Sequence, residues 1–171
     1  MSDLCVPNGL PVSFDRRRLY VDTNAFIELI ERQGETSDAL GRVFDAVEAK
    51  RLSACTSELT LAEILVRPKR EGNVALSRTY LDLLVFSRLV ELLPVDRAVL
   101  IETADYRATA KQEAVAVPDR RNFLPDAIHV VTAIRAGCGT FLARDGRIRL
   151  PVEIQRLPPD PSTLATFLNA I

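Results

Sequence analysis

Apolar residues along the chain alternate between short runs, which are typical of buried strands, and spacings of three to four residues, which are typical of helices. The runs that predict strands occupy residues 19–21, 52–56, 90–95 and 140–143, with a fifth candidate at 152–157. The helical spacing predicts helices over residues 24–31, 37–47, 58–67, 76–86, 97–109, 125–136 and 162–169. Strands that alternate with helices of this length favour a parallel sheet covered by helices.

The element boundaries have recognisable signals. Ser57 and Asp96 each stand just before a helical pattern, as N-cap residues do. Pro68 predicts the end of the helix that Ser57 begins, because the residue before a proline disfavours helical backbone. Residues 1–17 contain two prolines, a glycine and little apolar periodicity. The sequence therefore predicts an irregular N-terminal arm over 1–17, followed by a single domain over 18–171.

Composition fits one compact domain with a sizeable core. The chain has 171 residues, of which 47% are hydrophobic and 26% charged. Its net charge of −1 argues against strong overall attraction to nucleic acid, although local basic patches remain possible. Such clusters are Arg16 to Arg18, the run from Arg67 to Arg70, Arg120 with Arg121, and the group Arg144, Arg147 and Arg149.

Cysteine usage and the absence of a long apolar run bear on location. The three cysteines are far apart, with no Cys-x-x-Cys motif, which favours a reducing compartment. No stretch approaches the roughly 20 apolar residues of a membrane span, and the N-terminus lacks the pattern of a secretory signal. We therefore expect a cytoplasmic protein without a membrane partner.

Four acidic residues stand in apolar surroundings. They are Asp22 after the first strand run, Glu63 and Asp126 in helical runs, and Asp145 after the fourth strand run. Carboxylates that converge repel one another, and a hard divalent cation with oxygen ligands, Mg²⁺ or Mn²⁺, relieves that repulsion. Ligands gather at the carboxyl ends of parallel strands, where the following helices also begin. We therefore expect all four acids at one edge of the sheet.

Each acid also has an ordinary structural explanation. Asp22 fits an N-cap, Asp126 fits the positive end of a helix dipole, and Asp145 with Gly146 fits a turn. Glu63 fits a solvent-facing helix position. The shared position at one edge is what favours a metal centre over four separate explanations.

The single histidine, His129, restricts the chemistry. It stands three residues after Asp126 and is interpreted as a partly buried helix residue, with contact to the site or substrate as the alternative. Cleavage of RNA through its 2′-hydroxyl usually employs a separate acid and base, often two histidines. A metal-activated water is therefore the better nucleophile. The sequence also lacks Gly-x-Ser-x-Gly, Walker A and Gly-x-Gly-x-x-Gly motifs.

The ordered motifs resemble a PIN domain. The matching segments are Val21-Asp22-Thr23-Asn24, Leu61-Ala62-Glu63-Ile64-Leu65, Pro125-Asp126-Ala127-Ile128-His129 and residues 133–145. The chain is most similar to the VapC type, the toxin half of a type II toxin–antitoxin pair. The resemblance implies a three-layer α/β/α sandwich with a central parallel sheet and a Mg²⁺- or Mn²⁺-dependent endoribonuclease. It also implies a homodimer, a cognate antitoxin and an RNA substrate.

Carried over by motif, Asp22, Glu63, Asp126 and Asp145 would be the metal-binding catalytic acids. Thr23 and Asn24 would support Asp22 or position water. The implied reaction is attack of a metal-activated water on phosphorus, which leaves 5′-phosphate and 3′-hydroxyl ends.

The chain departs from the family pattern around the fourth acid. Ala143 stands where the family often has Thr or Ser, and Gly146-Arg147 stands where it often has a second acid. The N-terminal arm is also longer than usual. These departures favour one alternative, a PIN-like module that binds RNA or protein without cutting. Another alternative, a haloacid-dehalogenase-like phosphatase, needs Asp-x-Asp after the first strand, where this chain has Asn24.

Overall fold

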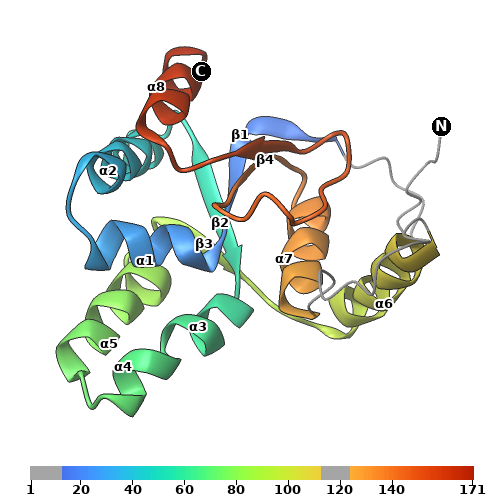
Figure 1. Ribbon diagram of the computed structural model, residues 1–171, viewed down its shortest axis with the longest axis horizontal. Coiled ribbons are helices and arrows are strands. Elements are labelled where there is room, and N and C mark those ends of the chain that lie inside the picture. Colours follow the sequence, from blue (N-terminus) through green and yellow to red (C-terminus); the bar gives the residue numbers. More distant parts are fainter. Residues whose placement is uncertain (1–12, 113–123) are drawn as a thin grey trace.

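The computed structural model describes residues 13–112 and 124–171, and its centre is a five-stranded parallel sheet (Figure 1). The strand order is β3-β2-β1-β4-β5, and every neighbouring pair is parallel. The strands are β1 Asp15–Val21, β2 Ser53–Ser57, β3 Val90–Leu93, β4 Cys138–Leu142 and β5 Gln155–Leu157. The parallel sheet predicted from the alternating pattern is confirmed, and the fifth strand candidate belongs to it.

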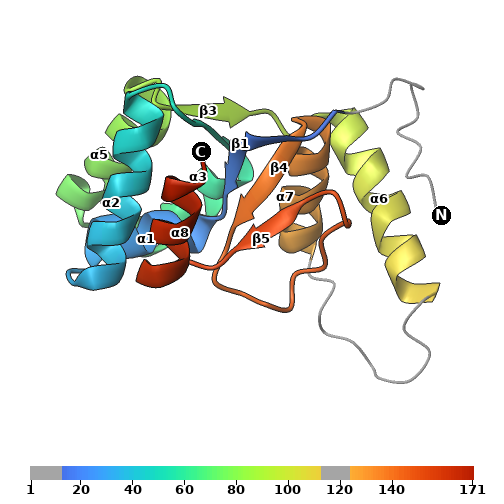
Figure 2. The same ribbon diagram turned by 90° about the horizontal axis from the view of Figure 1, so that it is seen from above.

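Helices cover both faces of this sheet (Figure 2). They are α1 Thr23–Glu31, α2 Glu35–Glu48, α3 Leu59–Ile64, α4 Val66–Arg70, α5 Val74–Leu81, the π-helical η1 Asp82–Phe86, α6 Arg97–Gln112, α7 Leu124–Arg135 and α8 Pro161–Asn169. No helix among the described residues is long and apolar enough to cross a membrane.

The side chains of β1 show how the layers form. Leu19 and Val21 face a core built with α1, α2 and α8, whereas Tyr20 faces the opposite core, which includes residues of α7. All three are fully buried, because both faces of the central strand are covered. The three-layer α/β/α architecture implied by the resemblance is therefore confirmed.

Strands β1 and β4 approach each other closely at Gly139. A Cβ atom there would lie 2.7 Å from the backbone nitrogen of Arg16 and 2.7 Å from the carbonyl carbon of Asp15. The pairing register of the two strands also shifts between Asp15 and Leu19. Glycine is therefore required at this position, where two backbones meet.

Several boundaries differ from the sequence prediction. Strand β1 begins at Asp15, inside the range predicted for the arm, and residues 1–12 lie outside the described residues. Pro68 does not end a helix but lies in the first turn of α4, where backbone N–H groups have no intrahelical acceptor, so proline costs little. The helix predicted over 76–86 begins earlier, at Val74, because the Asn73 side chain accepts a hydrogen bond from the Leu76 backbone N–H.

Candidate metal centre

The candidate centre lies beyond the carboxyl ends of β1 and β4. Asp22 directly follows β1, and its backbone N–H donates to the carbonyl oxygen of Leu142, the last residue of β4, at 3.0 Å. Glu63 lies on α3, and Asp126 lies in the first turn of α7. Asp145 follows β4 in the loop toward β5. The sheet topology thus brings acids from distant parts of the sequence toward one edge.

The Asp22 carboxylate is buried with little to balance its charge. Its residue is 5% exposed, and Asn24 donates a long side-chain hydrogen bond of 3.3 Å to it. Burial raises the pKa of the Asp22 carboxyl, and the neighbouring Glu63 charge raises it further. His129 and Asn24 oppose the rise without cancelling it. A cation bound beside this carboxylate would offset the cost of burying its charge.

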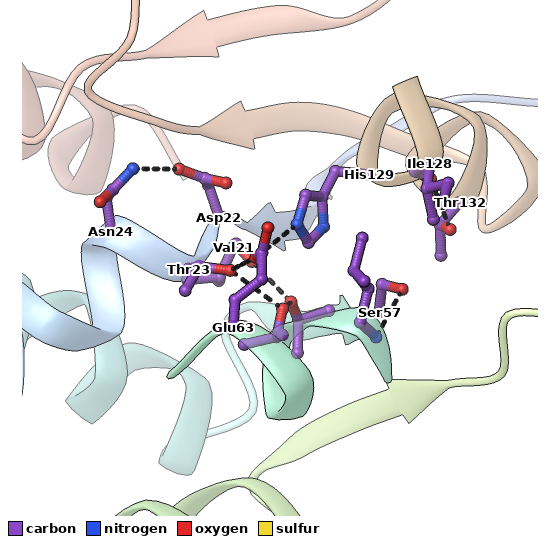
Figure 3. Close-up of polar contacts among 12 residues, drawn as sticks. Val21, Asp22, Thr23, Asn24, Ser57, Glu63, Ile128, His129 and Thr132 are labelled. Carbon is purple, nitrogen blue, oxygen red and sulfur yellow. Dashed lines mark hydrogen bonds and ion pairs between the residues drawn. The ribbon is translucent and has the colours of Figure 1, made fainter. Parts of the chain in front are cut away.

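Glu63 is held by two donors (Figure 3). Its Oε2 atom accepts a hydrogen bond from the Thr23 hydroxyl and lies 3.0 Å from Nε2 of His129. Burial alone would raise the pKa of the Glu63 carboxyl, but the hydrogen bonds from His129 and Thr23 outweigh it and lower that pKa. Glu63 is therefore stabilised as a carboxylate in a fixed orientation.

His129 connects Glu63 to Tyr20 inside the protein. The imidazole is buried, and its Nδ1 atom lies 2.6 Å from the Tyr20 hydroxyl oxygen. That hydroxyl accepts a hydrogen bond of 3.1 Å from the Ser57 backbone N–H, so its own hydrogen is free to point at Nδ1. Because the Glu63 carboxylate can only accept a hydrogen bond, Nε2 is the donor in this contact.

Tyr20 was not identified as a site residue from the sequence. The available signal was a hydroxyl group in the middle of a fully buried strand, because such a group needs a hydrogen-bond partner. Its partner, His129, was expected to be partly buried and is in fact fully buried against this hydroxyl.

Hydrogen bonds among threonine side chains connect α3, the helix that bears Glu63, to the end of β1. The Thr56 hydroxyl donates to the Val21 carbonyl oxygen at 2.8 Å and lies 2.8 Å from the Thr60 hydroxyl. Thr60 in turn lies 3.4 Å from the hydroxyl of Thr23. These contacts fix the helix that bears Glu63 against the strand end that bears Asp22.

The pKa of the Asp126 carboxyl is affected by each of the other three predicted acids. Burial raises the pKa of the Asp126 carboxyl first, and Asp22, Asp145 and Glu63 each raise it further, while His129 lowers it. The four predicted acids therefore act on one region of space. Negative charge accumulates around Asp126 in the metal-free protein.

Asp145 differs from the other three because its carboxylate is already paired. Its two oxygens accept hydrogen bonds from the Arg147 side chain at 2.7 to 3.1 Å, and Oδ1 also accepts from the Arg147 backbone N–H at 2.8 Å. These bonds lower the pKa of the Asp145 carboxyl to about 2. The fourth acid thus has a cationic partner within its own loop.

Two arginines of the basic clusters found in the sequence are also paired with acids. Arg144 pairs with Glu28 of α1 at 2.7 Å, and Arg67 of α4 pairs with Glu31. Both guanidinium groups remain more than half exposed. The cluster at Arg120 and Arg121 lies outside the described residues.

The donor set fits a hard divalent cation, although the ligands are not pre-assembled. Within residues 13–112 and 124–171, no group of three or more His, Cys, Asp or Glu side chains is close enough to enclose an ion by itself. Carboxylate oxygens are the ligands that Mg²⁺ and Mn²⁺ prefer. Burial, and to a smaller extent neighbouring acids, raises the pKa of Asp22 and of Asp126. The assignment of the acids as ligands remains a prediction.

Comparisons with known proteins agree with this arrangement. A family model described as PIN domain matches residues 19–151. The fold is similar to a chain in the crystal structure of VapBC2 from Rickettsia felis bound to a DNA fragment from their promoter, with a TM-score of 0.59 and 15% identity. That match covers 82% of this chain and 98% of the other.

The fold is also similar to a chain in the structure of FitAB bound to an IR36 DNA fragment. Here the TM-score is 0.60 at 20% identity, covering 82% of this chain and 94% of the other. A search of curated proteins found no match.

Proposed function

The chain belongs to the PIN domain family, and from this premise we propose that it is a divalent-metal-dependent endoribonuclease. We further propose that it is a VapC-type toxin of a type II toxin–antitoxin pair. The observation that supports the nuclease most directly is the convergence of acid-bearing elements at one edge of the sheet. Asp22 is bonded to the end of β4, and Glu63 contacts both Thr23, next to Asp22, and His129, one turn from Asp126. PIN domains generally use divalent metal ions, and this edge offers them oxygen ligands.

In the proposed site, Asp22, Glu63 and Asp126 hold Mg²⁺ or Mn²⁺. Asn24 orients the carboxylate of Asp22, and Thr23 with His129 orients that of Glu63. Asp145 contributes negative charge near Asp126 while Arg147 occupies its own oxygens. A bound metal ion supplies an activated water and compensates charge on the phosphate during hydrolysis.

These residues favour metal-assisted hydrolysis over attack by the RNA 2′-hydroxyl. His129 is the single histidine, and both of its ring nitrogens have partners inside the protein. It is therefore not available as a general acid or base toward RNA. The expected products have 5′-phosphate and 3′-hydroxyl ends.

Protein partners are part of the same proposal. The similarity to chains of the VapBC2 and FitAB structures supports a cognate antitoxin. A homodimer and a cytoplasmic location are further parts of the proposal. The exposed apolar side chains of Val74, Val85 and Phe86, on α5 and η1, offer a surface for a protein partner.

The proposal is tested by incubating the purified chain with total cellular RNA and Mg²⁺ or Mn²⁺, then mapping both ends of each product. Asp22→Asn and EDTA should each abolish cleavage. Asp45→Asn is the matched control, because Asp45 is an exposed acid on α2 that carries no proposed role. Discrete cuts with 5′-phosphate ends would support the nuclease if the unchanged protein and Asp45→Asn both make them and if Asp22→Asn and EDTA both abolish them.

Two results would contradict it. Cuts that persist in Asp22→Asn would indicate a contaminating nuclease. Absence of cuts, with RNA binding retained, would favour the alternative of a non-cutting PIN-like module. The pairing of Asp145 with Arg147 is the observation that keeps this alternative open.

A further inference from the structure

The loop after β4 contains an unusually complete carboxylate–guanidinium pair. Oδ1 of Asp145 accepts from the backbone N–H and Nε of Arg147 at 2.8 and 2.9 Å, and Oδ2 accepts from Nε and Nη2 at 3.1 and 2.7 Å. A carboxylate offers about four lone-pair sites. The hydrogen-bonding capacity of Asp145 is therefore used within its own loop.

Arg156 of β5 fixes the backbone of this loop. Its Nη1 donates to the Asp145 carbonyl oxygen at 2.6 Å, and its Nη2 donates to the Ile148 carbonyl oxygen. Ile148 is buried in the core on the α7 side of the sheet. The Asp145–Arg147 pair therefore lies on a turn whose backbone is held by Arg156. Ordinary surface ion pairs, in contrast, join two long and mobile side chains.

Arg147 lies close enough to the acidic edge to be affected by the charge of Asp126, and its side chain is accessible. The negative charge of Asp126 contributes to the raised pKa of the Arg147 guanidinium, after the contributions of Asp145. The Arg147 side chain is 75% exposed, and in the described part of the chain its Nη1 has no hydrogen-bond acceptor. One edge of the guanidinium is therefore occupied by Asp145 and the other is open.

We propose that Asp145 does not bind the metal ion but holds Arg147 as a contact for the RNA phosphate backbone. Arginine suits this task because its planar group bonds one oxyanion along each edge. The metal site would then consist of Asp22, Glu63 and Asp126, with a fixed cation beside it. The inference rests on the proposed function and replaces the ligand role that the family resemblance implies for Asp145.

The first test measures Mn²⁺ binding by calorimetry in the absence of RNA. Asp126→Asn should lose at least about tenfold in affinity, as expected for removal of a ligand or its close support. Asp145→Asn and Arg147→Gln should stay within about threefold of the unchanged protein. A loss in Asp145→Asn as large as that in Asp126→Asn would overturn the proposal.

The second test measures binding of a fluorescent random-sequence 12-nucleotide RNA by anisotropy in EDTA, where no cleavage occurs. Arg147→Gln should weaken binding about tenfold, because a charge-assisted hydrogen bond is lost. Arg147→Lys should recover part of that loss, and Asp145→Asn should weaken binding less than Arg147→Gln. Arg149→Gln, an equal change of charge in the same loop, should have a smaller effect.

The two tests separate this inference from the proposed function. Equal losses of RNA binding in Arg147→Gln and Arg149→Gln would overturn the specific role of Arg147. If the unchanged protein binds no Mn²⁺, the metal-dependent nuclease fails, while the anisotropy series still decides whether Arg147 contacts RNA. Melting curves of each variant verify that it is folded.

Discussion

Glu63 and His129 are 66 positions apart in the sequence, yet Oε2 of the carboxylate lies 3.0 Å from Nε2 of the imidazole. The far side of the same imidazole contacts the Tyr20 hydroxyl. Oε2 is thus fixed by its donors, whereas Oε1 has no hydrogen-bond partner among the described residues. The geometry leaves one carboxylate oxygen of Glu63 available to a cation.

Replacing His129 by two different amides should separate its two contacts. In His129→Gln the amide nitrogen can take the place of Nε2 and keep the bond to Glu63. In His129→Asn the shorter side chain can place its amide oxygen near the position of Nδ1, beside Tyr20, but leaves no donor for Glu63. We expect Mn²⁺ affinity to remain within about threefold in the Gln variant and to fall about tenfold in the Asn variant. Calorimetry measures both, and equal affinities would contradict the role assigned to the Nε2 donor.

Divalent metal should stabilise the folded protein. A ligand that binds the native state alone adds about 2.7 kcal/mol at a hundredfold excess over its Kd, which corresponds to a rise in Tm of about 5–10 °C for a chain of this size. Thermal melts over a millimolar Mn²⁺ series should show this rise, reduced in Asp126→Asn and retained in Asp45→Asn. An unchanged Tm would count against the acidic centre.

In the absence of divalent metal, removal of an acid should raise the Tm of the protein. The folded-state pKa of Asp126 lies above its ordinary value of 3.8, so the ionised carboxyl destabilises the fold. That cost is complete above the folded-state pKa and disappears as the pH falls below about 3.8, the unfolded value. In EDTA at pH 7, Asp126→Asn should therefore raise Tm slightly, because the removed charge is partly screened by solvent.

A pH series of melting curves checks the sign of this effect. The advantage of Asp126→Asn over the unchanged protein should shrink as the pH approaches 4, because the natural side chain then becomes neutral as well. An advantage that is constant from pH 7 to pH 4 would indicate a cause other than charge.

The close approach at Gly139 predicts a local stability effect. In Gly139→Ala the new Cβ would meet the backbone of Asp15 and Arg16 at 2.7 Å, so the strands must separate. We expect a loss of about 1–3 kcal/mol in the free energy of unfolding, measured with urea. Gly41→Ala is the matched control, because its Cβ would meet nothing within 4 Å inside α2 and should stabilise the helix by about 0.5–1 kcal/mol.

The sequence predicted the layers better than it predicted the details of the site. Apolar spacing is a local signal, and it located all five strands and the helix that bears Asp126. The bond between Tyr20 and His129 joins residues 109 positions apart, and nothing near either residue in the sequence identifies the other. Pairing of Asp145 with Arg147 is local, but a carboxylate near an arginine in sequence does not reveal whether the two bond.

Pro68 shows where a sequence rule for helix ends does not apply. The rule that a helix stops before proline applies to helix interiors, and here the chain begins a new helix at Val66. The break at Leu65 lies between α3, which packs against α1, and α4. The local pattern predicted one helix ending at 67, whereas α3 ends at Ile64 and α4 continues to Arg70.

Because the Asp22 N–H bonds to Leu142, the edge at which Asp22 lies can form only after β4 has been synthesised. Asp22 is made early, but the strand that positions it ends at residue 142, and β4 lies between β1 and β5 in the sheet. A ribosome-bound chain that has not yet released β4 cannot form this edge. The edge at which Asp22 lies is therefore incomplete until residues 138–142 have joined the sheet.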